Sequence, residues 1–171
     1  MVESDMRLDK RQQFEQLLEK NRRRFAAIAR SYASADDAED LFQEMLLQIW
    51  KSLDGYEGRA ALDTWAYRVA LNTATTYQRK SLEQRRKIKP SEELREPRAG
   101  DTRQPESARD EIRILNDFIR TLSKVDRAVF LLYLEGFDYH QMAEITGLTE
   151  NHLGVRISRI KQSYVDMHIG A

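Results

Sequence analysis

The stretch that decides the fold runs from Asp37 to Lys80 and reads DAEDLFQEMLLQIWKSLDGYEGRAALDTWAYRVALNTATTYQRK. It predicts two helices joined by a loop. The segment from Asp54 to Gly58 breaks the first helix, because its two glycines permit left-handed backbone angles and do not favour a continued helix. The second helix is expected to begin near Asp63, whose carboxylate is placed to accept hydrogen bonds from the first-turn amides as an N-cap.

The first of these helices has an apolar face and an acidic one. Its apolar residues recur at i, i+3, i+4 and i+7, which is the period of a buried helical stripe. We expect the core side to consist of Ala38, Leu41, Phe42, Met45, Leu46, Ile49, Trp50 and Leu53. A second stripe, called the acidic stripe below, consists of Asp40, Gln43, Glu44 and Leu47. Its composition fits either a face that contacts only water or a docking surface for a basic partner.

The second helix also divides into two sides. Its expected core stripe is Leu62, Trp65, Ala66, Val69, Ala70 and Tyr77. The opposite side, called the polar ridge below, offers hydrogen-bonding groups and cations and consists of Thr64, Arg68, Asn72, Thr75, Thr76 and Arg79. Because this side contains no carboxylate, it suits an anionic surface such as a nucleic-acid backbone.

Charge is segregated along the chain although its sum is zero, with 28 Lys and Arg against 28 Asp and Glu. Residues 37–58 hold one cation against six carboxylates, whereas residues 59–89 hold eight cations against two. Phosphate binding depends on the local cluster of cations and not on the sum, so a neutral total does not exclude nucleic acid. The six cations of residues 79–89 predict phosphate contacts that weaken with salt, and the alternative is a frayed helix end.

Composition excludes several kinds of site. The chain has no cysteine, which excludes disulfides, thiolate zinc sites and cysteine nucleophiles. The histidines His140, His152 and His168 are too scattered to suggest a metal cage, so we expect neither a metal nor a cofactor. The longest apolar runs are far shorter than a membrane span, and the N-terminus lacks the apolar core of a signal peptide. We therefore expect a cytoplasmic protein without membrane insertion.

All three prolines lie in residues 90–107, a segment with almost no apolar residue. This composition predicts a linker. It separates an N-terminal helical domain, residues 1–89, from a C-terminal helical domain, residues 108–171. The N-terminal domain is expected to contain a further long helix over residues 8–33. The predicted fold class is therefore all-α, with two small helical domains joined by a flexible linker.

The C-terminal domain has the sequence outline of a helix-turn-helix. A short helix from Tyr139 to Thr146 precedes a turn at Gly147, and Thr149 is expected to cap a final helix that ends near His168. Its core-facing residues are expected to be Leu153, Ile157, Ile160 and Tyr164. Its outer face, where a recognition helix meets base edges and phosphates, consists of Asn151, His152, Val155, Arg156 and Arg159. The alternative is a plain helical bundle with a solvated face.

Three runs of residues carry a family resemblance. The runs Asp37–Glu44 and Thr64–Asn72, followed by Tyr77 and Arg79–Lys80, resemble region 2 of bacterial sigma factors of the extracytoplasmic-function type. The run Glu150–Lys161 resembles region 4 of the same sigma factors. Because the runs match in order and spacing, with a linker between them, the resemblance is more specific than any one run alone.

The resemblance implies a sigma factor that binds core RNA polymerase and directs promoter-specific transcription initiation. It implies that the acidic stripe docks on the polymerase. It implies that the promoter −10 element is recognised and melted by Tyr56, Arg59, Asp63, Arg68, Asn72, Thr75, Thr76, Arg79 and Lys80. It implies that the −35 element is read by Thr149, Asn151, His152, Val155, Arg156 and Arg159.

The resemblance further implies an anti-sigma factor as a partner and no catalytic residues in this chain. The alternative function is a one-component helix-turn-helix DNA-binding regulator, with residues 1–89 as a dimerisation or ligand domain. A helix-turn-helix alone does not exclude that function, but a simple repressor does not need the promoter-melting run at residues 56–80. An enzyme is disfavoured, because no nucleophile–base pair or phosphate-binding loop occurs at a useful spacing.

Overall fold

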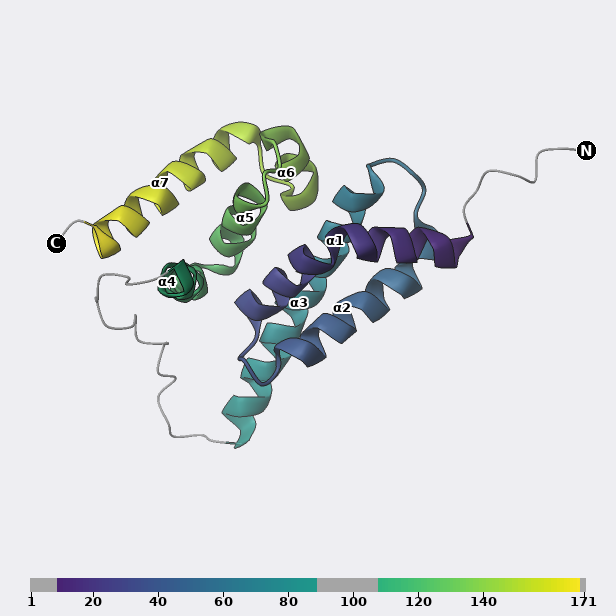
Figure 1. Ribbon diagram of the computed structural model, residues 1–171, viewed down its shortest axis with the longest axis horizontal. Coiled ribbons are helices and arrows are strands. Elements are labelled where there is room, and N and C mark those ends of the chain that lie inside the picture. Colours follow the sequence, from purple (N-terminus) through teal and green to yellow (C-terminus); the bar gives the residue numbers. More distant parts are fainter. Residues whose placement is uncertain (1–8, 89–107, 170–171) are drawn as a thin grey trace, which may run out of the picture. The chain divides into compact units, whose positions relative to one another are not determined.

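The computed structural model describes residues 9–88 and 108–169, and every regular element within them is a helix. This confirms the predicted all-α fold class. The elements are α1 (Lys10–Tyr32), α2 (Ala38–Ser52), the short 3-10 helix η1 (Leu53–Gly55), α3 (Leu62–Ile88), α4 (Ala108–Thr121), α5 (Lys124–Leu134), α6 (Tyr139–Thr146) and α7 (Glu150–His168) (Figure 1). The chain forms two compact units, and their boundary falls between Ala74 and Thr75, inside α3. The predicted linker lies outside the described residues.

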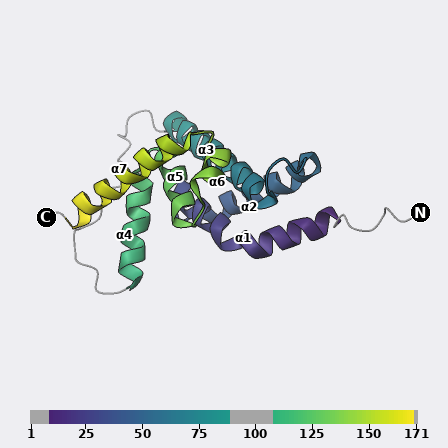
Figure 2. The same ribbon diagram turned by 90° about the horizontal axis from the view of Figure 1, so that it is seen from above.

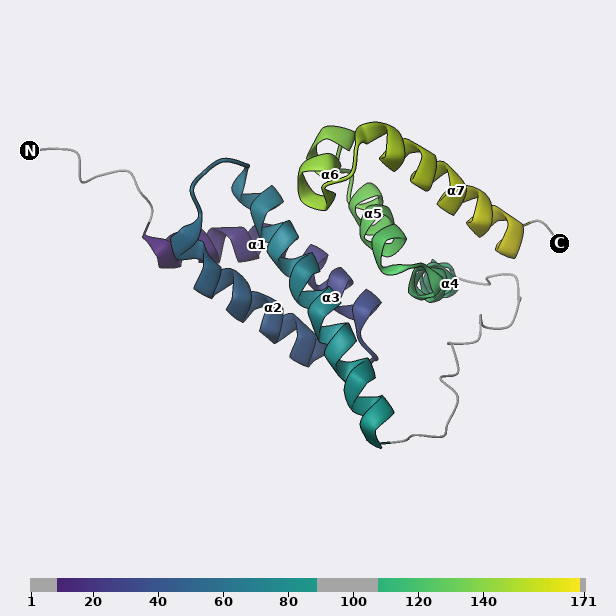
Figure 3. The same ribbon diagram turned by 180° about the vertical axis from the view of Figure 1, so that it is seen from behind.

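In the N-terminal unit, α1 and α2 pack side by side, and the first half of α3 passes over α1 (Figure 3). The periodic apolar residues of α2 make the predicted core contacts, because Leu41, Met45 and Ile49 are fully buried. The rings of Phe25 on α1 and Tyr67 on α3 lie 5.8 Å apart between their centroids. This aromatic contact fixes which side of α3 faces the core.

The sequence pattern predicts Trp50 in the core, and that prediction is wrong. Trp50 is 36% exposed. It lies near the end of α2, next to the first turns of α1, where α1 covers only part of the ring. Instead of being enclosed, the Trp50 ring meets the edge of Phe14 at 5.3 Å, and Lys10 Nζ lies 4.5 Å from the ring centroid. Large aromatic rings are often covered on one side in this way, because few sites can enclose the whole indole.

The buried side of α3 also differs from the prediction. Thr64, which the pattern places on the polar ridge, is only 2% exposed, whereas the expected core residues Trp65 and Val69 are half-buried. The buried side instead includes Tyr67 and Leu71. The face with Trp65 and Val69 and the face with Tyr67 and Leu71 both carry apolar or amphipathic residues. Periodicity alone therefore does not decide which face is buried, and packing against α1 selects the second one.

The predicted N-cap of α3 is wrong as well. The helix begins at Leu62, so Asp63 lies inside its first turn. The first backbone bond of the helix runs from the Trp65 amide to the Ala61 carbonyl oxygen, at 3.0 Å. The Asp63 side chain is therefore available for contacts with another helix, described below.

In the C-terminal unit, α7 packs against α5 and α6, and α4 packs against α5 (Figure 2). The helix-turn-helix has the predicted local structure. Gly147 ends α6 in the left-handed region, at φ 74°, and the Thr149 hydroxyl accepts a 3.3 Å hydrogen bond from the His152 amide as the cap of α7. Of the residues predicted to face the core, Leu153, Ile157 and Ile160 are buried and Tyr164 is half-buried.

Candidate docking and nucleic-acid surfaces

The acidic stripe forms one continuous surface on α2. Asp40, Gln43 and Leu47 are exposed, and Glu44 is half-buried beside them. The side chains are ordered by two hydrogen bonds across one helical turn: Gln43 Nε2 donates to Glu39 Oε1 at 2.9 Å, and Gln48 Nε2 donates to Glu44 Oε1 at 2.8 Å. Pairs at this spacing lie next to each other on a helix. The stripe thus presents an acidic surface with one exposed apolar residue, Leu47, at its C-terminal end.

The loop between η1 and α3 is folded against the start of α3. The Tyr56 hydroxyl donates to the Ala60 carbonyl oxygen at 2.5 Å, and the Tyr56 and Trp65 ring centroids lie 5.3 Å apart. Gly58 provides the left-handed turn, at φ 72°, that lets the loop close on itself. Arg59 at the tip forms an exposed 2.7 Å ion pair with Glu57.

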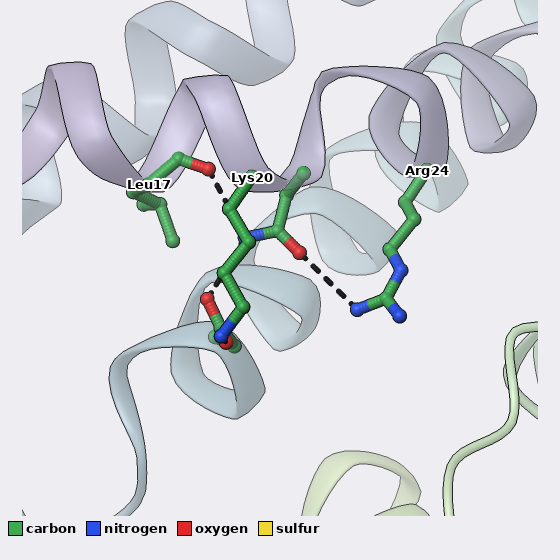
Figure 4. Close-up of polar contacts among 5 residues, drawn as sticks. Leu17, Lys20 and Arg24 are labelled. Carbon is green, nitrogen blue, oxygen red and sulfur yellow. Dashed lines mark hydrogen bonds and ion pairs between the residues drawn. The ribbon is translucent and has the colours of Figure 1, made fainter.

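Asp63 connects the first turn of α3 to α1. Its Oδ1 accepts a 2.8 Å hydrogen bond from Asn21 Nδ2, and its Oδ2 pairs with Lys20 Nζ. Asn21 is fully buried, and Figure 4 shows its neighbours on α1: it also donates to the Leu17 carbonyl oxygen at 3.0 Å and accepts from Arg24 Nη1 at 3.4 Å. Asn21 was not found from the sequence, although a polar residue one turn from Leu17 and Phe25 in an apolar stripe could have indicated it.

Apart from the buried Thr64, the polar ridge lies along the accessible side of α3. Arg68, Asn72 and Thr76 follow one another at i, i+4 and i+8, so they are aligned along the helix, and all three are exposed. Arg79 and Lys80 continue the exposed surface, and Thr75 is half-buried beside it. The cationic extension beyond Lys80 remains helical as far as Ile88.

The outer face of α7 carries the residues predicted for it. Asn151, His152, Val155 and Arg159 are exposed, and Arg156 is partly buried. An open depression beside α6 is lined by residues from both helices of the motif: Tyr139, Glu150, Asn151, Gly154, Val155, Ser158 and Arg159. Arg156 lies on the other side of this face, where its Nη1 forms a 2.5 Å ion pair with Asp126 Oδ1 of α5.

Gly154 in α7 gives a test of local helix energetics. An added Cβ would lie 3.5 Å from Tyr139 Cε2, which is an ordinary contact. We therefore expect Gly154→Ala to stabilise the C-terminal unit by about 1 kcal/mol, the difference between glycine and alanine in a helix. Gly147→Ala is a control with the opposite expected sign: it should destabilise the unit, because a residue with a Cβ loses about 1–2 kcal/mol of stability at φ 74°. Thermal unfolding followed by circular dichroism measures both, and a lower midpoint for Gly154→Ala would contradict the expectation.

Within residues 9–88 and 108–169, no three or more His, Asp or Glu side chains are grouped closely enough to hold a metal ion. In the same ranges, no helix is both long enough and apolar enough to cross a membrane.

Comparison with known families accounts for both units. The sigma-70 region 2 model matches residues 17–85, and the sigma-70 region 4 model matches residues 112–163, which together make up more than half of the chain. The chain belongs to the sigma-70 family. Its curated relatives place the sigma factor in the extracytoplasmic-function group, so its function is to direct RNA polymerase to promoters. Proteins of this family are in general not catalytic.

Among these relatives is the ECF RNA polymerase sigma-E factor of Haemophilus influenzae, 29% identical over 162 residues, which are 87% of this sigma factor and 84% of the relative. The ECF RNA polymerase sigma-E factor of Escherichia coli is 33% identical over 64 residues, 37% of this chain and 34% of the relative. The ECF RNA polymerase sigma factor SigG of Mycobacterium tuberculosis is 49% identical over 47 residues, 28% of this chain and 13% of the relative.

Two solved structures share the fold of this sigma factor. One is the sigma factor RpoE in complex with the anti-sigma factor NepR from Bartonella quintana, with a TM-score of 0.70 and 23% identity over 90% of this chain and 95% of the other. The second is CnrH in complex with the cytosolic domain of CnrY, with a TM-score of 0.67 and 20% identity over 93% of this chain and 88% of the other.

Proposed function

We propose that this sigma factor divides its work among three surfaces: the acidic stripe of α2 docks on core RNA polymerase, the loop and polar ridge of α3 recognise and melt the −10 element, and α7 reads the −35 element. The observation that carries the proposal is that α2 exposes an acidic stripe, whereas α3, the next α-helix along the chain, exposes a ridge that has cations and no carboxylate. Opposite charges on neighbouring helices suit two partners of opposite charge, a basic protein surface and a nucleic acid.

The −10 surface consists, in this proposal, of Tyr56, Arg59, Asp63, Arg68, Asn72, Thr75, Thr76, Arg79 and Lys80. Melting requires that unpaired bases be bound outside the stack, and the folded loop with Tyr56 at its base supplies hydrogen-bonding backbone and an aromatic ring for that purpose. Asp63 contributes indirectly: its bonds to Lys20 and Asn21 hold the first turn of α3, and hence the end of the loop, against α1.

The −35 surface consists of Thr149, Asn151, His152, Val155, Arg156 and Arg159. Thr149 caps the helix and so fixes the amides at its N-terminus, which suit a phosphate. Asn151 and His152 are placed for base edges, Val155 for apolar contact with a base, and the two arginines for guanine or phosphate. The depression between Tyr139 and Arg159 gives this face room for a ligand surface.

Arg156→Ala should weaken promoter binding about 10- to 100-fold, the range for a lost arginine contact to a base. The measurement is titration of holoenzyme, formed with the full chain, onto a promoter fragment selected by the wild-type holoenzyme from a randomised library. Assembly with polymerase should be unchanged. Arg109→Ala, an exposed arginine on α4, is the matched control and should bind as the wild type does. Equal promoter affinity for Arg156→Ala and wild type would remove Arg156 from the −35 surface.

We further propose that this sigma factor has an anti-sigma partner and acts in the cytoplasm. One of the two solved neighbours is a complex of a sigma factor with an anti-sigma factor, which supports an anti-sigma factor as a partner of this chain. Catalysis of RNA synthesis belongs to the polymerase, and this chain has no catalytic residue of its own. It acts where RNA polymerase and promoter DNA are, in the cytoplasm. In this proposal the region 2 domain comprises residues 1–89, the linker residues 90–107 and the region 4 domain residues 108–171.

Co-migration with bacterial core RNA polymerase on a sizing column tests the docking function. The wild-type chain should elute with the polymerase and, in the presence of promoter DNA, support initiation from it. If the chain elutes alone, and in particular as a dimer that binds duplex DNA, the one-component regulator takes the place of the proposed function. The two outcomes differ in the elution position of the chain, so they are not confused.

A further inference from the structure

Arg156 is the residue of the proposed −35 surface whose side chain is bound to a different helix by an ion pair. Its Nη1 lies 2.5 Å from Asp126 Oδ1, and the two side chains are 37% and 29% exposed. Fully exposed ion pairs contribute little to stability. This pair is more than half covered and short, which are the conditions under which a charge-assisted hydrogen bond fixes the geometry of an arginine.

Asp126 is itself held in place. Its second carboxylate oxygen, Oδ2, accepts a 2.9 Å hydrogen bond from the Ser123 hydroxyl, and the Asp126 amide donates to the same hydroxyl oxygen at 3.2 Å. Asp126 lies in the first turn of α5, a helix whose Val129 and Leu132 are fully buried. The carboxylate that meets Arg156 is therefore a fixed group on a core helix and not a mobile surface side chain.

A guanidinium that must select a base differs from one that only binds phosphate. Selection of guanine requires two N–H groups aligned with O6 and N7, whereas attraction to phosphate requires only the positive charge. An arginine free to change rotamer contacts phosphates of any sequence. Because a guanidinium has five N–H donors, a carboxylate that binds one edge orients the group and still leaves donors for a base.

We propose that Asp126 is a specificity-determining residue for promoter recognition: it holds Arg156 in the orientation that reads one base pair of the −35 element. Asp126 acts through Arg156 and does not itself contact DNA, so it is a positioning residue. Its negative charge also opposes phosphate binding by Arg156, which favours the base contact over the non-specific one. The inference rests on the proposed function of α7 as the helix that reads the −35 element.

The test is a selection from random DNA, so the promoter sequence need not be known beforehand. Holoenzyme formed with the full chain is incubated with a DNA library randomised over the −35 element, and the bound fraction is sequenced. Arg156→Ala should lose base preference at one or two adjacent positions. Asp126→Ala should lose preference at the same positions, with discrimination there reduced about tenfold, while binding to the unselected library stays equal or rises. Preference at the other positions should remain.

Two further variants separate positioning from folding. Asp138→Ala makes the same chemical change in the same unit and removes the N-cap of α6, where Asp138 Oδ1 accepts from the Gln141 amide at 2.8 Å, but it leaves the Asp126 pair intact. It should keep the wild-type preference at the positions read by Arg156. Asp126→Asn keeps an oxygen that can accept from Arg156 and should retain most of the preference that Asp126→Ala loses.

A wild-type profile for Asp126→Ala, together with a changed profile for Arg156→Ala, would overturn the positioning role. A loss of preference at all positions in both Asp126→Ala and Asp138→Ala would also overturn it, because the pair would then be structural. If Arg156→Ala itself selects the wild-type sequences, the error lies in the proposed function of α7 and not in the geometry of the pair.

Discussion

A chain that carries Asp40→Arg and Gln43→Ala should elute apart from core RNA polymerase under conditions in which the wild-type chain co-elutes with it. Both side chains are exposed on α2 and lie off its buried face. Charge reversal places a cation against a basic partner, and the second change removes a polar contact of the same surface. Loss of two central interface residues corresponds to an affinity at least about 100-fold weaker.

The matched control is Gln16→Ala with Glu19→Arg on α1. These positions are also exposed and one helical turn apart, and the pair makes the same two kinds of chemical change as the docking variant. The control should bind polymerase as the wild type does. Circular dichroism should give both variants the helix content and unfolding midpoint of the wild type. Full polymerase binding by the folded Asp40 and Gln43 variant would show that the acidic stripe is a solvated face.

Arg127→Ala should destabilise the C-terminal unit by about 3 kcal/mol, the cost of removing a buried charged hydrogen-bond donor. Arg127 is 6% exposed, and its Nη2 donates to the carbonyl oxygens of Arg120 and Leu122 at 2.7 and 3.1 Å. These carbonyls lie at the end of α4, where a helix has no backbone donors left for them. The side chain therefore joins α4 to α5, and its removal leaves these partly buried acceptors without a charged donor.

The two tryptophans make this prediction measurable in one sample. Trp50 and Trp65 both precede Ala74, so tryptophan fluorescence reports the N-terminal unit, whereas circular dichroism reports helices of both. In urea, Arg127→Ala should lower the midpoint of part of the dichroism change and leave the fluorescence transition unchanged. Arg113→Ala, an exposed arginine of α4, should alter neither. An unchanged dichroism curve for Arg127→Ala would mean that the Arg127 hydrogen bonds add no net stability.

Local features of this protein are readable from the sequence because their causes are local. The helices of the N-terminal unit follow from apolar residues at a 3.6-residue period, and the helix-turn-helix follows from Gly147 and Thr149 at the positions where a turn and a cap are needed. The exposed acidic stripe is predictable for the same reason: once Leu41, Met45 and Ile49 face the core, helix geometry places Asp40 and Leu47 elsewhere.

Contacts between segments distant in sequence were decided only by tertiary structure. The buried side of α3 depends on the Phe25 and Tyr67 contact, because apolar residues of that helix, such as Val69 and Leu71, do not all lie on one face. Asp63, which the local pattern predicts as a cap, instead bonds to Asn21, 42 residues away, and Arg156 pairs with Asp126, 30 residues away. Periodicity and capping specify which residues a helix can bury or expose. Which partner a polar side chain meets depends on how the helices pack, and no local pattern in the sequence encodes that.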